Sequence, residues 1–343
     1  MNRQLKTLWA VLAAGSLAVG AQAQDDRSGT AAMEELLVPV TPRTISLGNA
    51  ITSGLSTLSG VEAAQSNPAA LMTTNGTNVM FSRTDYIADI GINFFGAAQK
   101  FGNNTVSLSV VSWDYGDIPF TDESTVTEPN ADITYDATST VIGLSAARQF
   151  TDRIAAGFTV KGMTRSISES SAAGVGLDAG ITYAVGESGL RFGVSLKNFG
   201  TKQGFSGSDL DVETTIDGPE GPVTQVSQLD SQEDELPSQL NFGVAYTRQF
   251  AEGLTATGIA NFRSNAYDYD QYAGGVEVGY RNLLYVRGGI DLTSDIEMNA
   301  WSDWNIGAGL VLPVASTSIS IDYAYRPSSV FSSVNVFSLS VDL

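Results

Sequence analysis

The sequence contains no cysteine and no histidine among its 343 residues. Their absence excludes disulfide bridges, nucleophiles activated by histidine, and zinc sites built on thiolate or imidazole. Catalysis would then fall to carboxylates, and no pair of acidic residues is recognisable as an acid and base set. We therefore predict a protein that is not an enzyme, with no catalytic residues, no cofactor and no metal.

Positive charge is also scarce. The chain has 18 lysines and arginines against 37 acidic residues, a net charge of −19. Nucleic-acid binding needs basic patches that neutralise phosphates, so nucleic acid is excluded as a partner. After the first 23 residues, no apolar run approaches the roughly 20 residues that a helix needs to cross a bilayer. Any crossing of a membrane must therefore use strands.

The first 23 residues have the pattern of a secretory signal peptide. Arg3 and Lys6 form a basic start, residues 8–19 form a short apolar stretch, and Ala21-Gln22-Ala23 provides small residues for cleavage. We expect cleavage near Ala23 and export. No cysteine stands at this position, so a lipid anchor is excluded.

Apolar side chains occupy every second position in many stretches of the remaining chain. In Leu284–Leu292, leucine, valine and isoleucine alternate with tyrosine, arginine, glycine and aspartate. Successive side chains of a strand point to opposite faces, so one face is apolar and the other polar. A soluble sandwich also alternates, but the full charges and many glycines of the polar face favour a membrane barrel with a polar lumen.

Fourteen such stretches predict an all-β fold, a 14-stranded antiparallel transmembrane β-barrel over residues 77–343. Short turns should alternate with long outer connections, as expected when both chain ends lie on the periplasmic side. The predicted turns lie at residues 99–104, 151–152, 186–189, 251–253, 281–282 and 313–315. The predicted strands begin near Thr77, Tyr86, Thr105, Ser139, Arg153, Gly174, Leu190, Gln239, Leu254, Gln271, Leu283, Trp304, Ser316 and Val334.

Two outer connections, residues 114–138 and 201–238, are long and acidic. Such charge runs are usually solvated surface. A calcium site at Asp209, Asp211 and Glu213 is a minor alternative, because the glycine-containing loop of an EF-hand is absent. Connections of this length need a reason, and we favour flexible loops or surfaces that contact a protein partner.

Residues 24–76 do not alternate and are too apolar for a linker. They contain Ser46-Leu47-Gly48-Asn49-Ala50, followed by a run that ends in Asn67-Pro68-Ala69-Ala70-Leu71. This segment resembles the amino-terminal signature of the PorV/PorQ family of outer-membrane proteins, within the wider FadL-like superfamily. Asn49 stands where glycine is usual, and Ala70 where glycine is frequent, so the subfamily is open.

The resemblance implies that residues 24–76 form a plug or hatch in the periplasmic half of the barrel, with Gly48, Asn49, Asn67, Pro68 and Ala69 as its motif. The lumen of a barrel of this size is too wide for its own side chains to fill. Charged residues of the polar face either join plug to wall, which we favour, or bind an anionic head group or a carboxylate. These candidates are Lys161, Arg165, Arg191, Lys197, Arg263, Glu277, Arg287, Asp291, Asp322 and Arg326, and Phe95, Ile259 and Val311 are predicted to add apolar lumen surface.

Two functions follow from the resemblance. The first is an interaction or shuttle component of type IX protein secretion, whose partners are the translocon or exported proteins. The alternative is a FadL-like transporter of hydrophobic compounds such as long-chain fatty acids. Both place the protein among the lipids of the outer membrane of a Gram-negative-type bacterium, and fold-level analogy cannot choose between them.

Overall fold

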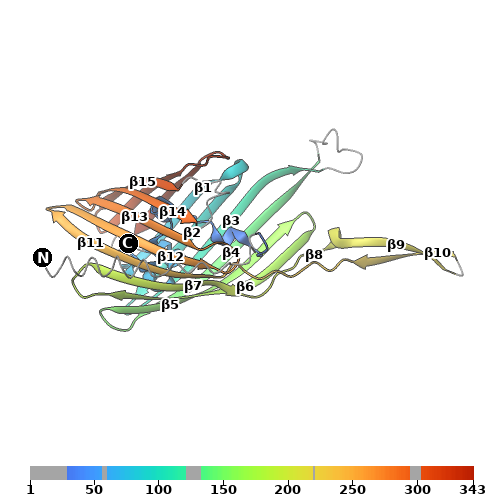
Figure 1. Ribbon diagram of the computed structural model, residues 1–343, viewed down its shortest axis with the longest axis horizontal. Coiled ribbons are helices and arrows are strands. Elements are labelled where there is room, and N and C mark those ends of the chain that lie inside the picture. Colours follow the sequence, from blue (N-terminus) through green and yellow to red (C-terminus); the bar gives the residue numbers. More distant parts are fainter. Residues whose placement is uncertain (1–28, 56–59, 121–132, 219–220, 294–302) are drawn as a thin grey trace.

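The computed structural model describes residues 29–55, 60–120, 133–218, 221–293 and 303–343, and its strands close into an antiparallel barrel (Figure 1). Each strand pairs with its neighbour along the chain, except that β7 pairs with β11 across the long outer connection. Pairing of β1 (Thr77–Asp85) with β17 (Val334–Asp342), in register from Asn78↔Asp342 to Asp85↔Asn335, closes the ring. The predicted fold class is confirmed.

Fourteen strands of the described chain form the barrel wall. The remaining twelve are β2 (Gly91–Phe101), β3 (Asn104–Pro119), β4 (Thr134–Gln149), β5 (Ile154–Ile167), β6 (Ser170–Ala184), β7 (Leu190–Gly200), β11 (Gln239–Ala251), β12 (Leu254–Asn265), β13 (Gln271–Tyr280), β14 (Leu284–Thr293), β15 (Trp304–Val314) and β16 (Thr317–Arg326).

The two faces of the wall differ as the alternation predicts. Outward positions carry large apolar side chains that are exposed, among them Leu144, Phe192, Val286 and Phe337. Inward positions are mostly buried, although the wall is a single sheet and cannot cover its own inward side chains. Side chains inside the barrel must therefore be covered by something other than the wall.

Short turns join the strands at one end of the barrel, which we call the turn end, and longer connections join them at the other, the loop end. The turns use left-handed backbone, as in Arg281 and Asn282, with φ of 53° and 56°. A hairpin turn of this kind matches the twist of the strands it joins. Thr77 and Leu343 both lie at the turn end, hydrogen-bonded to each other through their backbones.

Three sequence expectations about strand extent need correction. The second strand begins at Gly91 and not near Tyr86, because a short 3-10 turn, η4 (Ile87–Asp89), intervenes. The strands β3 and β4 pair well past the barrel body, so the connection predicted at residues 114–138 is shorter, and its residues 121–132 lie outside the described residues. The signal-peptide prediction also lies outside them.

The third correction concerns residues 201–238, which are not a plain loop. They contain β8 (Ser206–Gly207), η5 (Ser208–Leu210) and a hairpin made of β9 (Asp211–Gly218) and β10 (Gly221–Gln228). This hairpin projects far beyond the loop end of the barrel (Figure 1). Its alternation is partial and its charge high, which explains why composition indicated a loop.

Residues 29–55 and 60–76 precede the wall, and their regular structure consists of short helical turns. These are η1 (Glu34–Leu37), α2 (Pro42–Ser46), η2 (Ile51–Ser53), α3 (Val61–Ser66) and η3 (Pro68–Thr73). No helix in the described part of the chain is long and apolar enough to cross a membrane.

Candidate functional site in the barrel lumen

Residues 29–55 and 60–76, called here the inner segment, pack against the inward faces of the strands. The helix α2 contacts β14 to β17, η2 contacts β7, β11 and β12, α3 contacts β1 to β3, and η3 contacts β3 to β6. Leu47, Ile51, Val61 and Leu71 are completely buried there. The buried core of this molecule is therefore the contact between the inner segment and the wall.

The first contact depends on wall glycines that let two backbones meet. A side-chain carbon on Gly157 would lie 2.6 Å from the Pro68 carbonyl, and one on Gly193 would lie 2.2 Å from the Thr52 carbonyl oxygen. No residue but glycine fits such an approach without displacing backbone. We call the four glycines Gly157, Gly180, Gly193 and Gly243, with Thr52, Ser53, Asn67 and Pro68, the amide seat.

Asn67 is the polar centre of the amide seat. Its side-chain nitrogen donates to the Thr52 carbonyl at 2.8 Å and approaches the wall carbonyls of Ile181 and Val194 at 3.3 and 3.4 Å. Its side-chain oxygen accepts from the Ala69 backbone N–H at 3.0 Å and caps η3. The asparagine and proline of the motif thus start the helical turn and join it to the wall.

A second backbone contact surrounds the other half of the motif. Gly48 has φ of 65°, and a side-chain carbon there would lie 2.3 Å from the Ile290 carbonyl oxygen. Two wall glycines lie on the same contact: Gly275 faces Leu47, and Gly289 faces Leu47 and Gly48. Asn49 also adopts a left-handed conformation, φ 58°, and its carbonyl accepts a hydrogen bond of 3.1 Å from Arg263. Asparagine tolerates this conformation better than most residues, so its departure from glycine is accommodated.

Five buried charges form a third contact, which we call the charged seat. Arg287 donates to Glu277 at 2.6 Å and to Asp322 at 2.5 Å on the inner wall. Arg43 of α2 lies 3.5 Å from Asp322 and 3.9 Å from Glu62 of α3. All five side chains are nearly inaccessible to solvent. The wall and the inner segment therefore share one ionic network.

Burial changes the pKa of two acidic groups of the inner segment, Glu62 and Glu34. Burial raises the pKa of Glu62 above its ordinary value, while the Arg43 charge partly offsets the increase. Burial also raises the pKa of Glu34, assisted by the charges of Asp268 and Glu35. Sequence reasoning did not select Arg43 or Glu62 as site residues, although charges inside an apolar segment were a usable signal.

The other predicted lumen charges also lie on inward positions but do not form one group. Lys161 pairs with Asp178 at 2.7 Å and donates to Asn198 at 2.8 Å. Arg165 pairs with Glu35 near the loop end. Arg263 contacts the Asn49 carbonyl as described above, and Lys197 lines a cavity described below. Arg191 near the turn end and Asp291 and Arg326 toward the loop end are separate from the two pairs.

The predicted apolar lumen residues are partly wrong. Phe95 is 50% exposed and points outward, whereas its neighbour Phe94 is completely buried inside. Ile259 is 7% exposed and faces the inner segment, and Val311 shares the inward register with Ser320. The parity of β2 was misassigned because its inward face, which includes Ile92 and Phe94, meets an apolar segment and not water.

Three cavities lie along the inner segment from the loop end to the turn end. The loop-end cavity, about 170 Å³, is lined by Glu34, Leu37, Tyr267 and Asp268 among others. The middle cavity, about 60 Å³, lies beneath residues 35–41, and Leu37 lines both cavities. The turn-end cavity, about 180 Å³, lies beyond Asn67 and Pro68.

The middle cavity combines apolar walls with two amines. Val111, Trp113 and Val141 supply wall surface, and Lys161 and Lys197 reach it from β5 and β7. Lys161 is neutralised by Asp178, as described above. Lys197 has no ion pair and no hydrogen bond of its ammonium group to any described residue. Lys197 is only partly exposed, and a cation that makes no ion pair beside apolar surface favours the approach of an anionic group.

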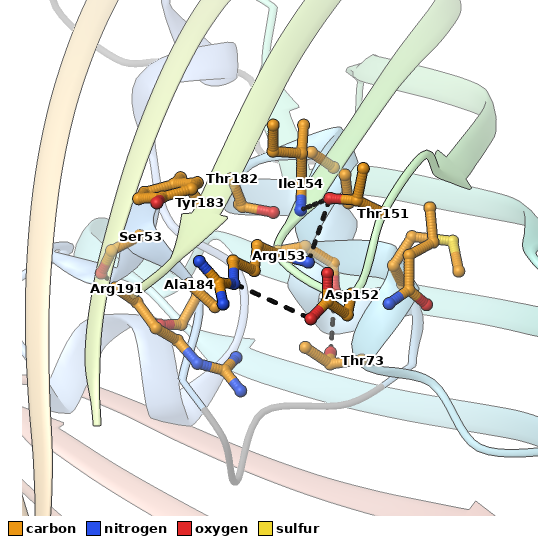
Figure 2. Close-up of a pocket in the computed structure, with 16 residues that line it drawn as sticks. Ser53, Thr73, Thr151, Asp152, Arg153, Ile154, Thr182, Tyr183, Ala184 and Arg191 are labelled. Atoms are coloured by element: carbon orange, nitrogen blue, oxygen red, sulfur yellow. Dashed lines mark hydrogen bonds and ion pairs between the residues drawn. The ribbon is translucent and has the colours of Figure 1, made fainter. Parts of the chain in front are cut away.

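The turn-end cavity is larger than the middle cavity and is also lined in part by polar side chains (Figure 2). Its wall includes the β4–β5 turn, where the Thr151 hydroxyl accepts hydrogen bonds from the backbone N–H groups of Arg153 and Ile154 at 3.2 and 3.0 Å. Arg191 and Tyr183 line it from β7 and β6, and Ser53 lines it from the inner segment. Two arginines, Arg153 and Arg191, and one acidic residue, Asp152, thus line this cavity at the turn end.

Comparison with known proteins identifies solved structures of similar fold. No family model matches the chain, and no curated protein matches it. The CymD monoaromatic hydrocarbon channel is 14% identical over 89% of this chain and 97% of its own, with a TM-score of 0.58. The Pseudomonas putida toluene transporter TodX is 13% identical over 87% and 96%, with a TM-score of 0.54. A FadL homologue of Pseudomonas aeruginosa is 13% identical over 89% and 98%, with a TM-score of 0.52.

At these identities the likeness establishes the barrel fold and nothing finer. The resemblance to the PorV/PorQ family stays a prediction, because no family model supports it. The three compared structures are channels or their homologues, and none is described as a secretion component.

Proposed function

We propose that the protein is an outer-membrane channel for hydrophobic small molecules, which corresponds to the transporter alternative. The proposal is supported by the closed barrel, the exposed apolar side chains on its outer face, and the transport described for the compared structures. The turn end would face the periplasm, and the loop end would face the exterior.

The order of the cavities supports a path past the inner segment. A molecule would enter the loop-end cavity, pass Leu37 into the middle cavity, and pass Asn67 and Pro68 into the turn-end cavity. A cavity of roughly 150 Å³ can hold benzene. The outer two cavities meet that size, whereas the middle cavity does not. Passage therefore requires residues 35–41 or the amide seat to move.

The observation that carries the proposal is the position of Lys197 in the middle cavity. Its ammonium group lies beside apolar walls and makes no ion pair or hydrogen bond with any described residue. A compound with an apolar body and a carboxylate, such as a long-chain fatty acid, would satisfy both features. Once residues 35–41 move to enlarge the cavity, such a ligand would bind with its carboxylate toward Lys197 and its chain against Val111 and Trp113.

The test compares a fatty acid with the alcohol of the same chain length. Purified protein should bind the acid more tightly, and Lys197→Met should remove about tenfold or more of that preference, because hydrogen bonds to charged groups are strong. Lys202→Met, which changes an exposed loop lysine, is the matched control. Lys197→Arg should retain the preference. Equal binding of acid and alcohol by the unchanged protein would contradict the carboxylate assignment, and binding of neither would contradict the transport proposal.

The secretion role stays an untested prediction. No contact, cavity or charge within the described lumen favours it over transport. Co-purification of a type IX translocon component with the full-length protein would support the secretion role.

A further inference from the structure

The projecting hairpin is the largest feature that the proposed channel does not use. The strands β9 and β10 form a separate two-stranded sheet, in register from Asp211↔Gln228 to Gly218↔Gly221. Within the described residues, neither strand pairs with any other strand, so each has a free edge. Free edges are templates for adding a strand, and proteins usually protect them.

The base of the hairpin is firmly attached to the barrel. The strand β8 pairs with the start of β6, and the Glu169 backbone N–H donates to Asp209 at 2.9 Å. Gln203 and Asp234 exchange two backbone hydrogen bonds of 2.9 Å across the two chains that lead to the hairpin. The hairpin is thus held in a defined direction, away from the lumen (Figure 1).

The two faces of the hairpin carry different side chains, because residues paired across strands share a face. One face carries Asp211 and Glu213 on β9. The other face has no charge and exposes Val212, Ile216 and Val223 by 40%, 53% and 61%. Apolar side chains this exposed lie beyond the barrel wall, where lipid cannot cover them.

The edges of the two strands also differ. Pro222 stands near the tip of β10 and lacks the N–H that a pairing strand needs. The described part of β9 contains no proline and no lysine, the residues that commonly protect edges. From Gln203 to Thr247 the sequence contains no lysine or arginine at all. The free edge of β9 is therefore open, acidic on one face and apolar on the other.

We infer that β9 is a docking edge for an extended polypeptide segment in which basic and apolar residues alternate. Such a segment would add to the sheet as a third strand and place its basic side chains beside Asp211 and Glu213. Its apolar side chains would cover Val212 and Ile216 on the other face. Main-chain hydrogen bonds would give affinity and the two faces would give selectivity, as in other strand additions.

A second copy of this chain is a poor occupant of the same edge. Pairing β9 with another β9 would bring Asp211 and Glu213 of the two copies together, and like charges across strands are unfavourable. The inference is independent of the proposed channel function.

The experiment measures binding of labelled synthetic peptides to the full-length protein in detergent by fluorescence anisotropy. The probe is as long as β9 and alternates valine with lysine. It should bind, and binding should weaken as salt increases, because the charges are exposed. Three comparison peptides are an alternating valine and glutamate peptide, a peptide with the same valines and lysines in two blocks, and a backbone N-methylated form of the probe. All three should bind at least tenfold more weakly.

Variants locate the site. Glu213→Gln should weaken probe binding about two- to fivefold, as expected for an exposed ion pair. Val212→Ser should weaken it by about fivefold, whereas the matched change Val226→Ser on the acidic face should not. Glu187→Gln, in a turn at the opposite end of the barrel, is the charge control and should have no effect.

Several results would overturn the inference. Equal binding of the block peptide would show simple charge attraction, and equal binding of the N-methylated peptide would exclude strand addition. A dimer that forms without peptide and is lost in Ile216→Asp would identify a second copy as the occupant. None of these variants should change fatty-acid binding, and Lys197→Met should not change peptide binding, so failure of one proposal leaves the other testable.

Discussion

The amide seat and the charged seat hold the same inner segment by different physics. In the amide seat, glycines let the backbones of wall and segment touch, and Asn67 supplies neutral hydrogen bonds. In the charged seat, Arg43 and Glu62 enter an ionic network of the wall. One contact depends on the absence of side chains, and the other depends on long, ionised ones.

The difference indicates how the inner segment can be both fixed and movable. Backbone contact through glycines is insensitive to pH and salt, because no ionisable group takes part. The charged seat responds to protonation and to loss of one partner, because buried charges are stable only when paired. We therefore expect the amide seat to set the position of the segment and the charged seat to set how readily it leaves.

The largest effect is expected from removal of the central cation of the charged seat. Arg43→Met leaves Glu62 and a wall carboxylate without their shared partner and should weaken seating of the inner segment by about 3–5 kcal/mol. Conductance of single channels in planar bilayers should rise. The double variant Arg43→Met with Glu62→Gln should recover part of the loss. A double variant as leaky as the single one would show that the charges do not act as a network.

A filled glycine position should disturb the amide seat next most strongly. Gly193→Val would push a side chain into the Thr52 and Ser53 backbone, and overpacking of this kind costs about 1–3 kcal/mol. Cells that carry the variant should become sensitive to large antibiotics. Gly162→Val, where a side chain would meet no atom within 4 Å, is the matched control. Equal sensitivity of the two variants would place the inner segment elsewhere.

Loss of the Asn67 amide should have a moderate effect. Asn67→Ala removes the cap of η3 and the hydrogen bond to Thr52, at a cost of about 1–2 kcal/mol. Faster proteolysis within residues 29–76 of the folded barrel would report it. Asn103→Ala, in an exposed turn, should leave proteolysis unchanged. If proteolysis is as slow as in the unchanged protein, the motif does not hold the segment.

The smallest effect should depend on pH. Well below pH 4.5, the ordinary pKa of a glutamate, Glu62 is protonated whether the segment is seated or free, and seating carries no ionisation cost. As pH rises, the free segment loses its proton first, because burial raises the pKa of the seated carboxyl, so seating weakens. Glu62→Gln mimics the protonated form, and should seat at least as firmly at neutral pH and equally at low pH. Hydrogen exchange of α3 at the two pH values checks this, with Glu187→Gln as control. A Glu62→Gln segment that exchanges faster only at neutral pH would contradict it.

Alternation made the barrel predictable from the sequence, because each strand buries one face and exposes the other. Alternation did not give the correct face for Phe95, because we assumed that the lumen-facing side of each strand is the polar one. The inward face of β2 packs on apolar residues such as Val61, so polarity no longer separates the faces. The hairpin was missed for a related reason, since the described side chains of β9 and β10 on both faces are exposed to solvent.

Contacts between the inner segment and the wall could be anticipated only in part. The motif residues Gly48 and Asn67 were selected by resemblance, but their partners, Ile290 and Val194, contribute backbone atoms. Backbone carries no sequence signal of its own. The pairing of Arg43 with Asp322 joins residues far apart in the chain, and only the closed barrel brings them together.

The inner segment runs through the lumen from the loop end, where the Ala32 backbone N–H donates to the Glu235 carbonyl, to the turn end at Thr77. Both seats lie inside the closed ring, so the segment reaches them more readily before the ring closes than after it. The inner segment precedes every strand in the chain and is synthesised first. We therefore expect it to be in place before β1 pairs with β17 and closes the ring. Pairing of β1 with β17 would then be the last step of folding and would occur only after the inner segment is seated.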